Sequence, residues 1–133
     1  MNARSYKLAG RSGQALISML LIFLGLLALT GIGLDVALQV YARQKLQHTV
    51  DAAAIAGARQ VGAGVVFATI VTDTQNHAVA NAAAKGAAAG STAFNATVVT
   101  DAQNVTRVTV NGSWTVRNVF GSLVGAAANT TIQ

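Results

Sequence analysis

The chain has 133 residues, of which 53% are hydrophobic and 10% charged, and its formal net charge is +5. Soluble domains carry about 25% charged residues, so this composition excludes an ordinary soluble globule and also a disordered chain. Cysteine and proline are both absent. The sequence therefore excludes disulfides and thiolate chemistry, and nothing in it forbids a long unbroken helix.

The most apolar segment is a run of 20 residues, 15–34. A helix of that length spans about 30 Å, the thickness of a bilayer's hydrocarbon core. Three basic residues precede the run, namely Arg4, Lys7 and Arg11, and Asp35 closes it. The positive-inside rule then predicts a single-pass protein with its N-terminus in the cytoplasm and residues 36–133 outside. A removed secretory signal is the alternative, but its apolar region usually has about 7–15 residues, so the length favours an anchor.

The helical pattern continues beyond the run to Gln60, with apolar and small residues at three- and four-residue steps. A helix over 14–60 would be about 70 Å long, so it must project out of the membrane. We therefore expect a basic cytoplasmic leader (1–13), a hydrophobic stalk helix (14–60) and an extracytoplasmic head (61–133). The charges after Asp35 are too dilute and scattered to predict a nucleic-acid partner.

Small residues recur along the stalk at a spacing of four. Thr49, Ala53 and Gly57 form one row, Ala54 lies beside it, and Gly33 and Ala37 repeat the spacing nearer the run. Such rows let helix backbones approach closely, which predicts a packing surface for neighbouring helices. The alternative is that alanine is simply a good helix former.

The head is expected to contain one more helix, starting at Thr72 or Asp73 and ending near Ala88, and three strands. The predicted strands cover 94–100, 105–116 and 126–132, with a short helical turn over 118–124. The fold class is therefore α+β: a long N-terminal hydrophobic helix, then a small head with a second helix and a three-stranded antiparallel sheet.

Asn111-Gly112 resembles a two-residue hairpin turn, but the alternation of the flanking residues argues for one continuous strand. A hairpin there would place Val110 and Trp114 on opposite faces, whereas an unbroken strand keeps the apolar residues together. We expect this apolar face to pack on the second helix and on Phe120 and Leu123.

No motif of catalytic or metal-binding chemistry is present. His48 and His77 are the only imidazoles, they stand in no metal-ligand spacing, and the sequence has no glutamate. We therefore expect no enzyme, no cofactor and no metal. Four asparagines fit the glycosylation pattern, which threonine-rich strands also produce by composition: Asn95, Asn104, Asn111 and Asn129.

Five short segments of the stalk carry a resemblance: Gly13-Gln-Ala-Leu, Gly33-Leu-Asp35-Val, Tyr41-Ala-Arg43, Leu46-Gln47 and Asp51-Ala-Ala-Ala-Ile-Ala-Gly57. In this order they resemble the N-terminal module of TadE/TadG-like Flp pilus-assembly proteins. The resemblance implies a pilin-like subunit of the bacterial inner membrane, in contact with lipid before assembly and with copies of itself or other pilus subunits afterwards. The resemblance and the small-residue rows together give the stalk residues expected in assembly or helix packing: Gly33, Asp35, Ala37, Tyr41, Arg43, Leu46, Thr49, Ala53, Ala54 and Gly57.

The resemblance also suggests leader cleavage after Gly10 or Gly13, which would need a glutamate five residues later. That position is Ala15 or Ser18 here, so the uncleaved, TadG-like branch fits better. The alternative function is a single-pass, membrane-anchored binding protein that does not polymerise.

Asp35 has no charged partner one turn away in its own helix, since Gly31 and Gln39 occupy those positions. We expect it to be solvated by lipid headgroups; the alternative is a contact with Arg43 or Lys45 of a neighbouring stalk.

Overall fold

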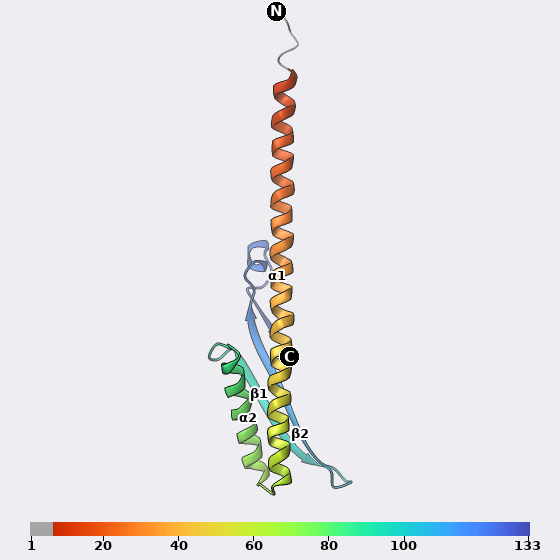
Figure 1. Ribbon diagram of the computed structural model, residues 1–133, viewed down its shortest axis with the longest axis vertical. Coiled ribbons are helices and arrows are strands. Elements are labelled where there is room, and N and C mark those ends of the chain that lie inside the picture. The colour runs from red at the N-terminus through yellow and green to blue at the C-terminus, as the bar shows by residue number, and fades with distance from the viewer. Residues whose placement is uncertain (1–6) are drawn as a thin grey trace, which may run out of the picture.

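One helix, α1 (Lys7–Gly62), runs almost the full length of the molecule (Figure 1). A computed structural model describes the backbone of residues 7–133 and the side chains of residues 13–123 and 125–133. Because no proline interrupts it, α1 continues for 56 residues, about 84 Å. The predicted continuity of the apolar run and the stalk is confirmed. The helix ends at Gly62, and Gly64, with φ of 75°, makes the turn that follows.

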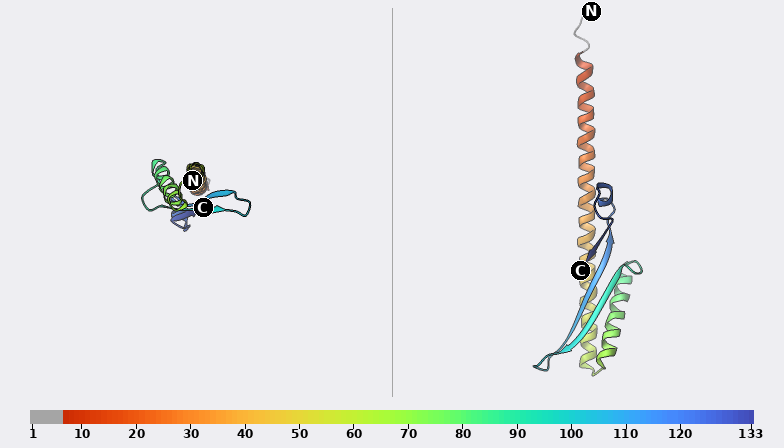
Figure 2. Two further views of the ribbon diagram at one scale, coloured as in Figure 1. Left: turned by 90° about the horizontal axis from the view of Figure 1, so that it is seen from below. Right: turned by 180° about the vertical axis from the view of Figure 1, so that it is seen from behind.

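Helix α2 (Phe67–Ala84) packs beside the end of α1 and runs back along it (Figures 1 and 2). It begins earlier than predicted, since Val66 is the N-cap residue and makes no side-chain capping bond. Packing decides this start rather than a capping hydroxyl, because the buried residues Ile70, Thr74, Ala78 and Ala82 form one continuous stripe at four-residue steps. The helix also ends earlier than Ala88.

The sheet contains β1 (Thr92–Thr100), β2 (Thr106–Arg117) and β3 (Asn129–Ile132), all antiparallel and in the order β1-β2-β3. The three predicted strands are confirmed, and β2 runs unbroken through Asn111 and Gly112. A 3₁₀ helix, η1 (Gly121–Val124), connects β2 to β3.

The turn between β1 and β2 lies at Asp101–Val105 instead of Asn111-Gly112. The Asp101 carboxylate accepts the backbone N–H of Gln103 at 3.0 Å and that of Val105 at 2.9 Å. Asn104 has φ of 59°, a conformation that asparagine tolerates better than most residues. The side chain of Asp101 and the backbone of Asn104 therefore make this reversal of the chain. Gly112 takes no part in the turn.

Gly112 allows a close approach between the sheet and α1. It pairs with Phe94 across β1 and β2, and a Cβ atom on it would lie 2.8 Å from the Phe94 ring and 2.9 Å from Val50 of α1. The absence of a side chain therefore lets the Phe94 ring lie over the backbone of β2 beneath α1.

Both helices pack on one face of the sheet, and the other face is exposed. Along β2 the inward residues alternate with exposed ones such as Thr109 and Thr115, as the unbroken strand requires. The core between the layers consists of small and apolar side chains: Ala42, Leu46, Ala53, Ile70, Ala78, Ala82, Ala96 and Trp114. The predicted inward position of Trp114 is confirmed. Two predicted contacts are wrong, because β2 packs mainly on α1 instead of α2, and because the Leu123 side chain is 80% exposed.

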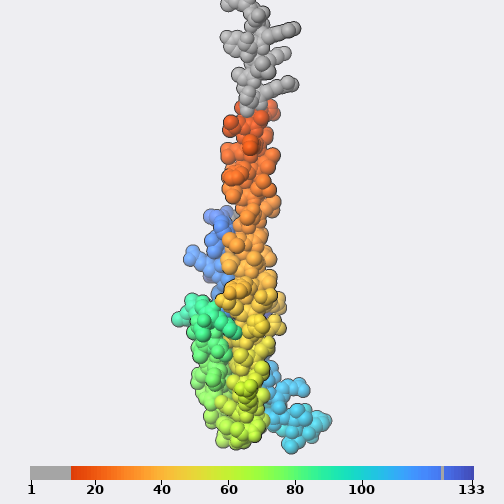
Figure 3. Space-filling view, in the orientation of Figure 1, coloured from red at the N-terminus to blue at the C-terminus, as the bar shows by residue number. Residues whose placement is uncertain are grey.

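The head covers only part of α1 and only one side of it (Figures 2 and 3). From residue 13 to residue 30 every residue of α1 is exposed, and Gly31 is the first buried one. The space-filling view shows this upper part of the helix standing clear of the rest of the chain.

Candidate assembly site

The uncovered part of α1 is strongly apolar. Every large hydrophobic side chain from Leu16 to Leu29 is at least 52% exposed. The Thr30 hydroxyl is compatible with an apolar environment, since it donates to the carbonyl of Leu26 at 2.8 Å within the same helix. By length and composition α1 could cross a membrane, because its most apolar window has a mean hydropathy of 2.6. Large exposed apolar surfaces of this kind mark sites of contact with a membrane or with other proteins.

The head first touches α1 at Gly31, where the Phe120 side chain lies against the helix. A Cβ atom on Gly31 would lie 2.8 Å from Cγ of Phe120, so only glycine admits this contact. Phe120 is the residue just before η1, and the segment from β2 to β3 therefore lies level with the last turn of the apolar run (Figure 1).

Asp35 fastens this segment to the stalk. Its carboxylate accepts the backbone N–H of Val119 and of Phe120, both at 2.9 Å, and also that of Gly121. Burial of the carboxyl raises its pKa, but the bonds from Gly121, Val119 and Phe120 outweigh this effect, so the pKa of Asp35 lies below its usual value. The expectation of solvation by headgroups is wrong, since Asp35 is only 5% exposed.

A second polar contact lies one turn further along α1. Gln39 donates to the side-chain oxygen of Asn118 at 2.9 Å, and Asn118 in turn donates to the carbonyl of Ala127 at 2.7 Å and to the Thr130 hydroxyl at 2.9 Å. Asn118 is 8% exposed. Asp35 and Gln39, four residues apart on one face of α1, together hold both ends of the β2–β3 connection.

The row Thr49, Ala53 and Gly57 is enclosed by the chain's own head. Thr49 and Ala53 are fully buried, and a Cβ atom on Gly57 would collide with the Thr74 hydroxyl and lie 3.0 Å from Val108. The close backbone approach that the spacing predicts is therefore made inside the molecule, between α1, α2 and β2. This corrects the interpretation of the row as a surface for a neighbouring helix.

The other predicted assembly residues divide between the two sides of α1. Gly33, Ala37, Tyr41 and Arg43 are exposed, Ala54 is half-buried and Leu46 is 4% exposed in the core. A Cβ atom on Gly33 would meet nothing within 4 Å, so this glycine lies on the open side of the stalk. The Lys45 ammonium lies 4.5 Å from the centre of the Tyr41 ring and donates to the Lys85 carbonyl at 2.9 Å, so it is engaged within the chain.

The predicted leader is described only in part. Gly10 lies in the helical backbone of α1, and Gly13 is exposed with no neighbour near its Cβ position. Arg4 lies outside the described residues, as do the side chains of Lys7 and Arg11. Cleavage at either glycine stays a prediction.

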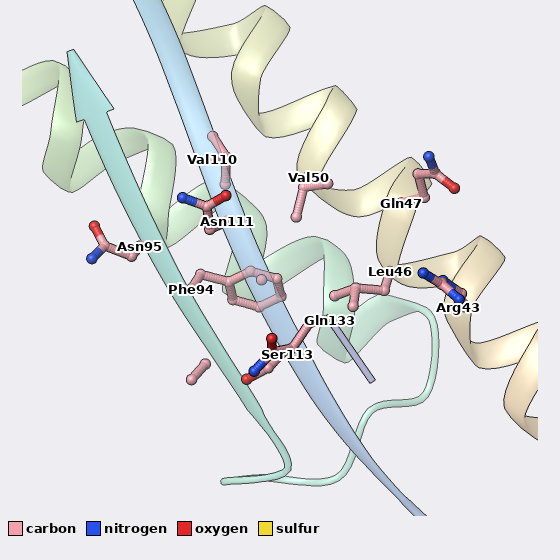
Figure 4. A pocket seen from close by; sticks show the side chains of 12 residues that line it. Arg43, Leu46, Gln47, Val50, Phe94, Asn95, Val110, Asn111, Ser113 and Gln133 are labelled. Atoms are coloured by element: carbon pink, nitrogen blue, oxygen red, sulfur yellow. The ribbon is translucent and has the colours of Figure 1, made fainter. Parts of the chain in front are cut away.

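A groove of about 840 Å³ lies between α1 and the sheet (Figure 4). Its lining includes Leu46 and Val50 from α1 and Phe94 from β1, with asparagine, glutamine and serine side chains around them. Arg43 is the only charged residue of the lining. The groove therefore offers apolar contact and amide hydrogen bonds, and its lining contains no acid–base pair.

Sequence reasoning missed Gln39 and Asn118, and it also missed the contact of Phe120 with Gly31. The one available signal was Asp35 and Gln39 at four-residue spacing, two polar groups on an otherwise apolar face. The residues that Asp35 and Gln39 contact lie 79 to 86 positions away in the chain. No local sequence pattern predicts contacts between residues so far apart.

Comparison with known protein families gives a match for the stalk. Residues 13–60 match the model of the TadE/G-like Flp pilus-assembly family. Searches of the curated proteins and of the solved structures found no match. The matched residues run from the start of the uncovered apolar segment to the last turns of α1, and so include the Asp35 contact. Over residues 13–60, the N-terminal helix of this chain is thus similar to the TadE/G-like Flp pilus-assembly family.

Proposed function

We propose that the protein is a structural, pilin-like subunit of a Tad/Flp pilus, either the filament subunit or a minor pilin, which assembles through α1. The observation that carries the proposal is the uncovered apolar segment 13–30, which is continuous with a stalk that the head covers on one side only. Before assembly this segment is held in the inner membrane by lipid. In the pilus, the same surface packs against the stalks of neighbouring subunits.

The proposed assembly surface is narrower than the whole stalk. It comprises the uncovered apolar residues 13–30 and the open side of α1 at Gly33 and Ala37, because the row from Thr49 to Gly57 is already occupied by the head. Exposed glycine and alanine at a spacing of four suit close helix approach. We propose the orientation that the basic leader predicts, with residues 36–133 on the outer side of the membrane.

The same proposal includes no catalytic activity, no cofactor and no nucleic-acid partner. It rests on the sequence, whose only imidazoles stand in no metal-ligand spacing, and on the scattered charges of the head.

The groove between α1 and the sheet supports one alternative. Its apolar floor and ring of amide side chains suit a peptide or small ligand, so the chain could act as a membrane-anchored binding protein that never polymerises.

A pair of matched variants separates the two functions. Gly33→Leu places a large side chain on the open side of the stalk, whereas Ala80→Leu places one on the exposed side of α2, away from the stalk. Both positions are exposed and helical, so both variants should reach the membrane at normal levels. We expect Gly33→Leu to abolish surface pili, counted by electron microscopy in the native bacterium, and Ala80→Leu to keep them. Normal piliation of the Gly33→Leu strain would favour the binding protein.

A further inference from the structure

The connection between β2 and β3 exposes large apolar side chains at one place on the head. Leu123 is 80% exposed, Val119 54% and Phe120 37%. The alanines that follow, residues 126–128, are exposed as well. We call residues 119–128 the apolar loop. Such a cluster on the surface of a small head requires an explanation.

The loop lies at the end of the head that is nearest to the uncovered apolar helix. Both side views show the segment around η1 beside the middle of α1, next to its uncovered part, whereas α2 and the β1–β2 turn lie toward the opposite end (Figures 1 and 2). Phe120 meets α1 at Gly31, three residues before the end of the apolar run at Leu34. With a rise of about 1.5 Å per residue, this contact lies roughly 4.5 Å inside the level at which the run ends.

The chemistry of the loop fits that level. Residues 118–133 include no charged residue, although the head as a whole contains both acids and bases. Arg117, exposed at the end of β2, stands two residues before the loop. Asp35 is the acid that contacts the loop, and its carboxylate is turned onto the backbone N–H groups of Val119, Phe120 and Gly121 instead of toward solvent. Neither the loop nor its attachment therefore presents a free charge to lipid, where a charge is costly.

The loop is also held in place. Besides the bonds to Asp35, the N–H of Ala126 donates to the Gly121 carbonyl at 2.9 Å, and Gly125, with φ of 82°, closes η1. Leu123 is thus fixed outward by backbone contacts on both sides, so its exposure is a property of the folded loop.

We propose that the apolar loop is a membrane-contact element that inserts Val119, Phe120 and Leu123 into the interfacial layer of the bilayer on the outer side. This inference rests on the proposed membrane span of α1. Two apolar surfaces, the helix and the loop, then meet lipid at the same level, and the head stands on the membrane in a fixed orientation. Lipid is the occupant because the loop continues the surface of the span without an intervening charge.

The test uses the full chain in nanodiscs of phosphatidylethanolamine and phosphatidylglycerol, with one protein per disc. Because the sequence has no cysteine, a single cysteine can be introduced and labelled with a polarity-sensitive fluorophore. The three variants are Leu123→Cys in the loop, Leu24→Cys in the span and His77→Cys on the exposed side of α2. Quenching is measured with lipids that carry a doxyl group at one of two depths, near the headgroup for the loop or near the end of the acyl chain for the middle of the span.

We expect a blue-shifted emission and strong quenching for Leu123→Cys and Leu24→Cys, and neither effect for His77→Cys. Quenching of Leu24→Cys without quenching of Leu123→Cys would overturn the loop proposal and leave the membrane span intact. Absence of quenching at both positions would overturn the span as well. A third outcome is a blue-shifted emission of Leu123→Cys that appears only when several proteins share a disc and that the doxyl lipids do not quench. This outcome would show that a second copy covers the loop, and it would also overturn the proposal.

Discussion

Asp35, just after the apolar run, attaches the head to the stalk. A carboxylate at this place would be costly in lipid if it were unpaired, but here it collects three backbone N–H groups that η1 and the residues before it would otherwise leave unsatisfied. The same carboxylate therefore follows the end of the apolar run and fixes the level at which the head begins. Because the Asp35 carboxylate is buried, we expect its substitution to loosen residues 119–121 strongly.

Replacing Asp35 with asparagine removes the charge and one of the two acceptor oxygens. Because charge-assisted hydrogen bonds are the stronger ones, we expect amide exchange at residues 119–121 to become roughly tenfold faster or more in Asp35→Asn. Hydrogen–deuterium exchange with mass spectrometry, on the full chain in detergent micelles, measures this. Asp51→Asn is the matched control, since Asp51 lies exposed on the same helix. Equal exchange in the two variants would contradict the attachment.

The same contact predicts a response to acid. The pKa of Asp35 is lowered in the folded protein, so its contribution to stability is complete above the ordinary aspartate pKa and is lost as the pH falls through the lowered value. We therefore expect the β2–β3 connection to loosen below about pH 4 in the native protein, measured by the same amide exchange at residues 119–121. In Asp35→Asn the connection is already loosened at neutral pH. Its amide exchange at residues 119–121 should therefore show no further loosening in acid.

At the scale of elements, α1 uses its small residues in two ways. Toward the head, Gly31 and Gly57 admit side chains of Phe120 and Thr74 that a Cβ atom would displace. Away from the head, Gly33 meets nothing within 4 Å. The two faces of one helix therefore give opposite expectations for the same substitution.

Gly57→Leu should destabilise the head, by about 1–3 kcal/mol or more for overpacking a filled site. Gly33→Leu should leave stability unchanged or raise it slightly, because leucine is the better helix former by nearly 1 kcal/mol. Trp114 is the only tryptophan and is buried, so its fluorescence during denaturant unfolding in micelles reports on the head of both variants. Equal denaturant midpoints for the two variants would contradict the close packing of Thr74 and Val108 against Gly57.

The elements themselves could largely be predicted from local pattern. The absence of proline and the continuous apolar periodicity predicted α1, and the alternation around Trp114 predicted an unbroken β2. The start of α2 could not be predicted from a capping residue, because burial of Ile70 against its neighbours sets it. The spacing of Thr49, Ala53 and Gly57 correctly indicated close packing, but a spacing does not identify the partner, which is the chain's own head.

For the whole molecule, the sequence predicted a stalk with a head but could not predict how far the head reaches along the stalk. That reach depends on Phe120 at Gly31 and on the Asp35 contacts, which join residues more than 80 positions apart. It matters for function because, among the described residues, the uncovered part of α1 ends at residue 30. The apolar run, which begins at residue 15, therefore contributes about 24 Å of uncovered helix, most of the thickness of a bilayer core.

The central claim is that this uncovered segment packs against other subunits in an assembled pilus, and disulfide cross-linking in pili sheared from the native bacterium tests it most directly. A cysteine at Leu20, exposed in the middle of the segment, is compared with one at His77, exposed on α2. We predict that the protein is present in the sheared pili and that Leu20→Cys is oxidised to cross-linked species there, while His77→Cys stays uncross-linked. A protein found only in the membrane fraction, with Leu20→Cys uncross-linked, would contradict the account.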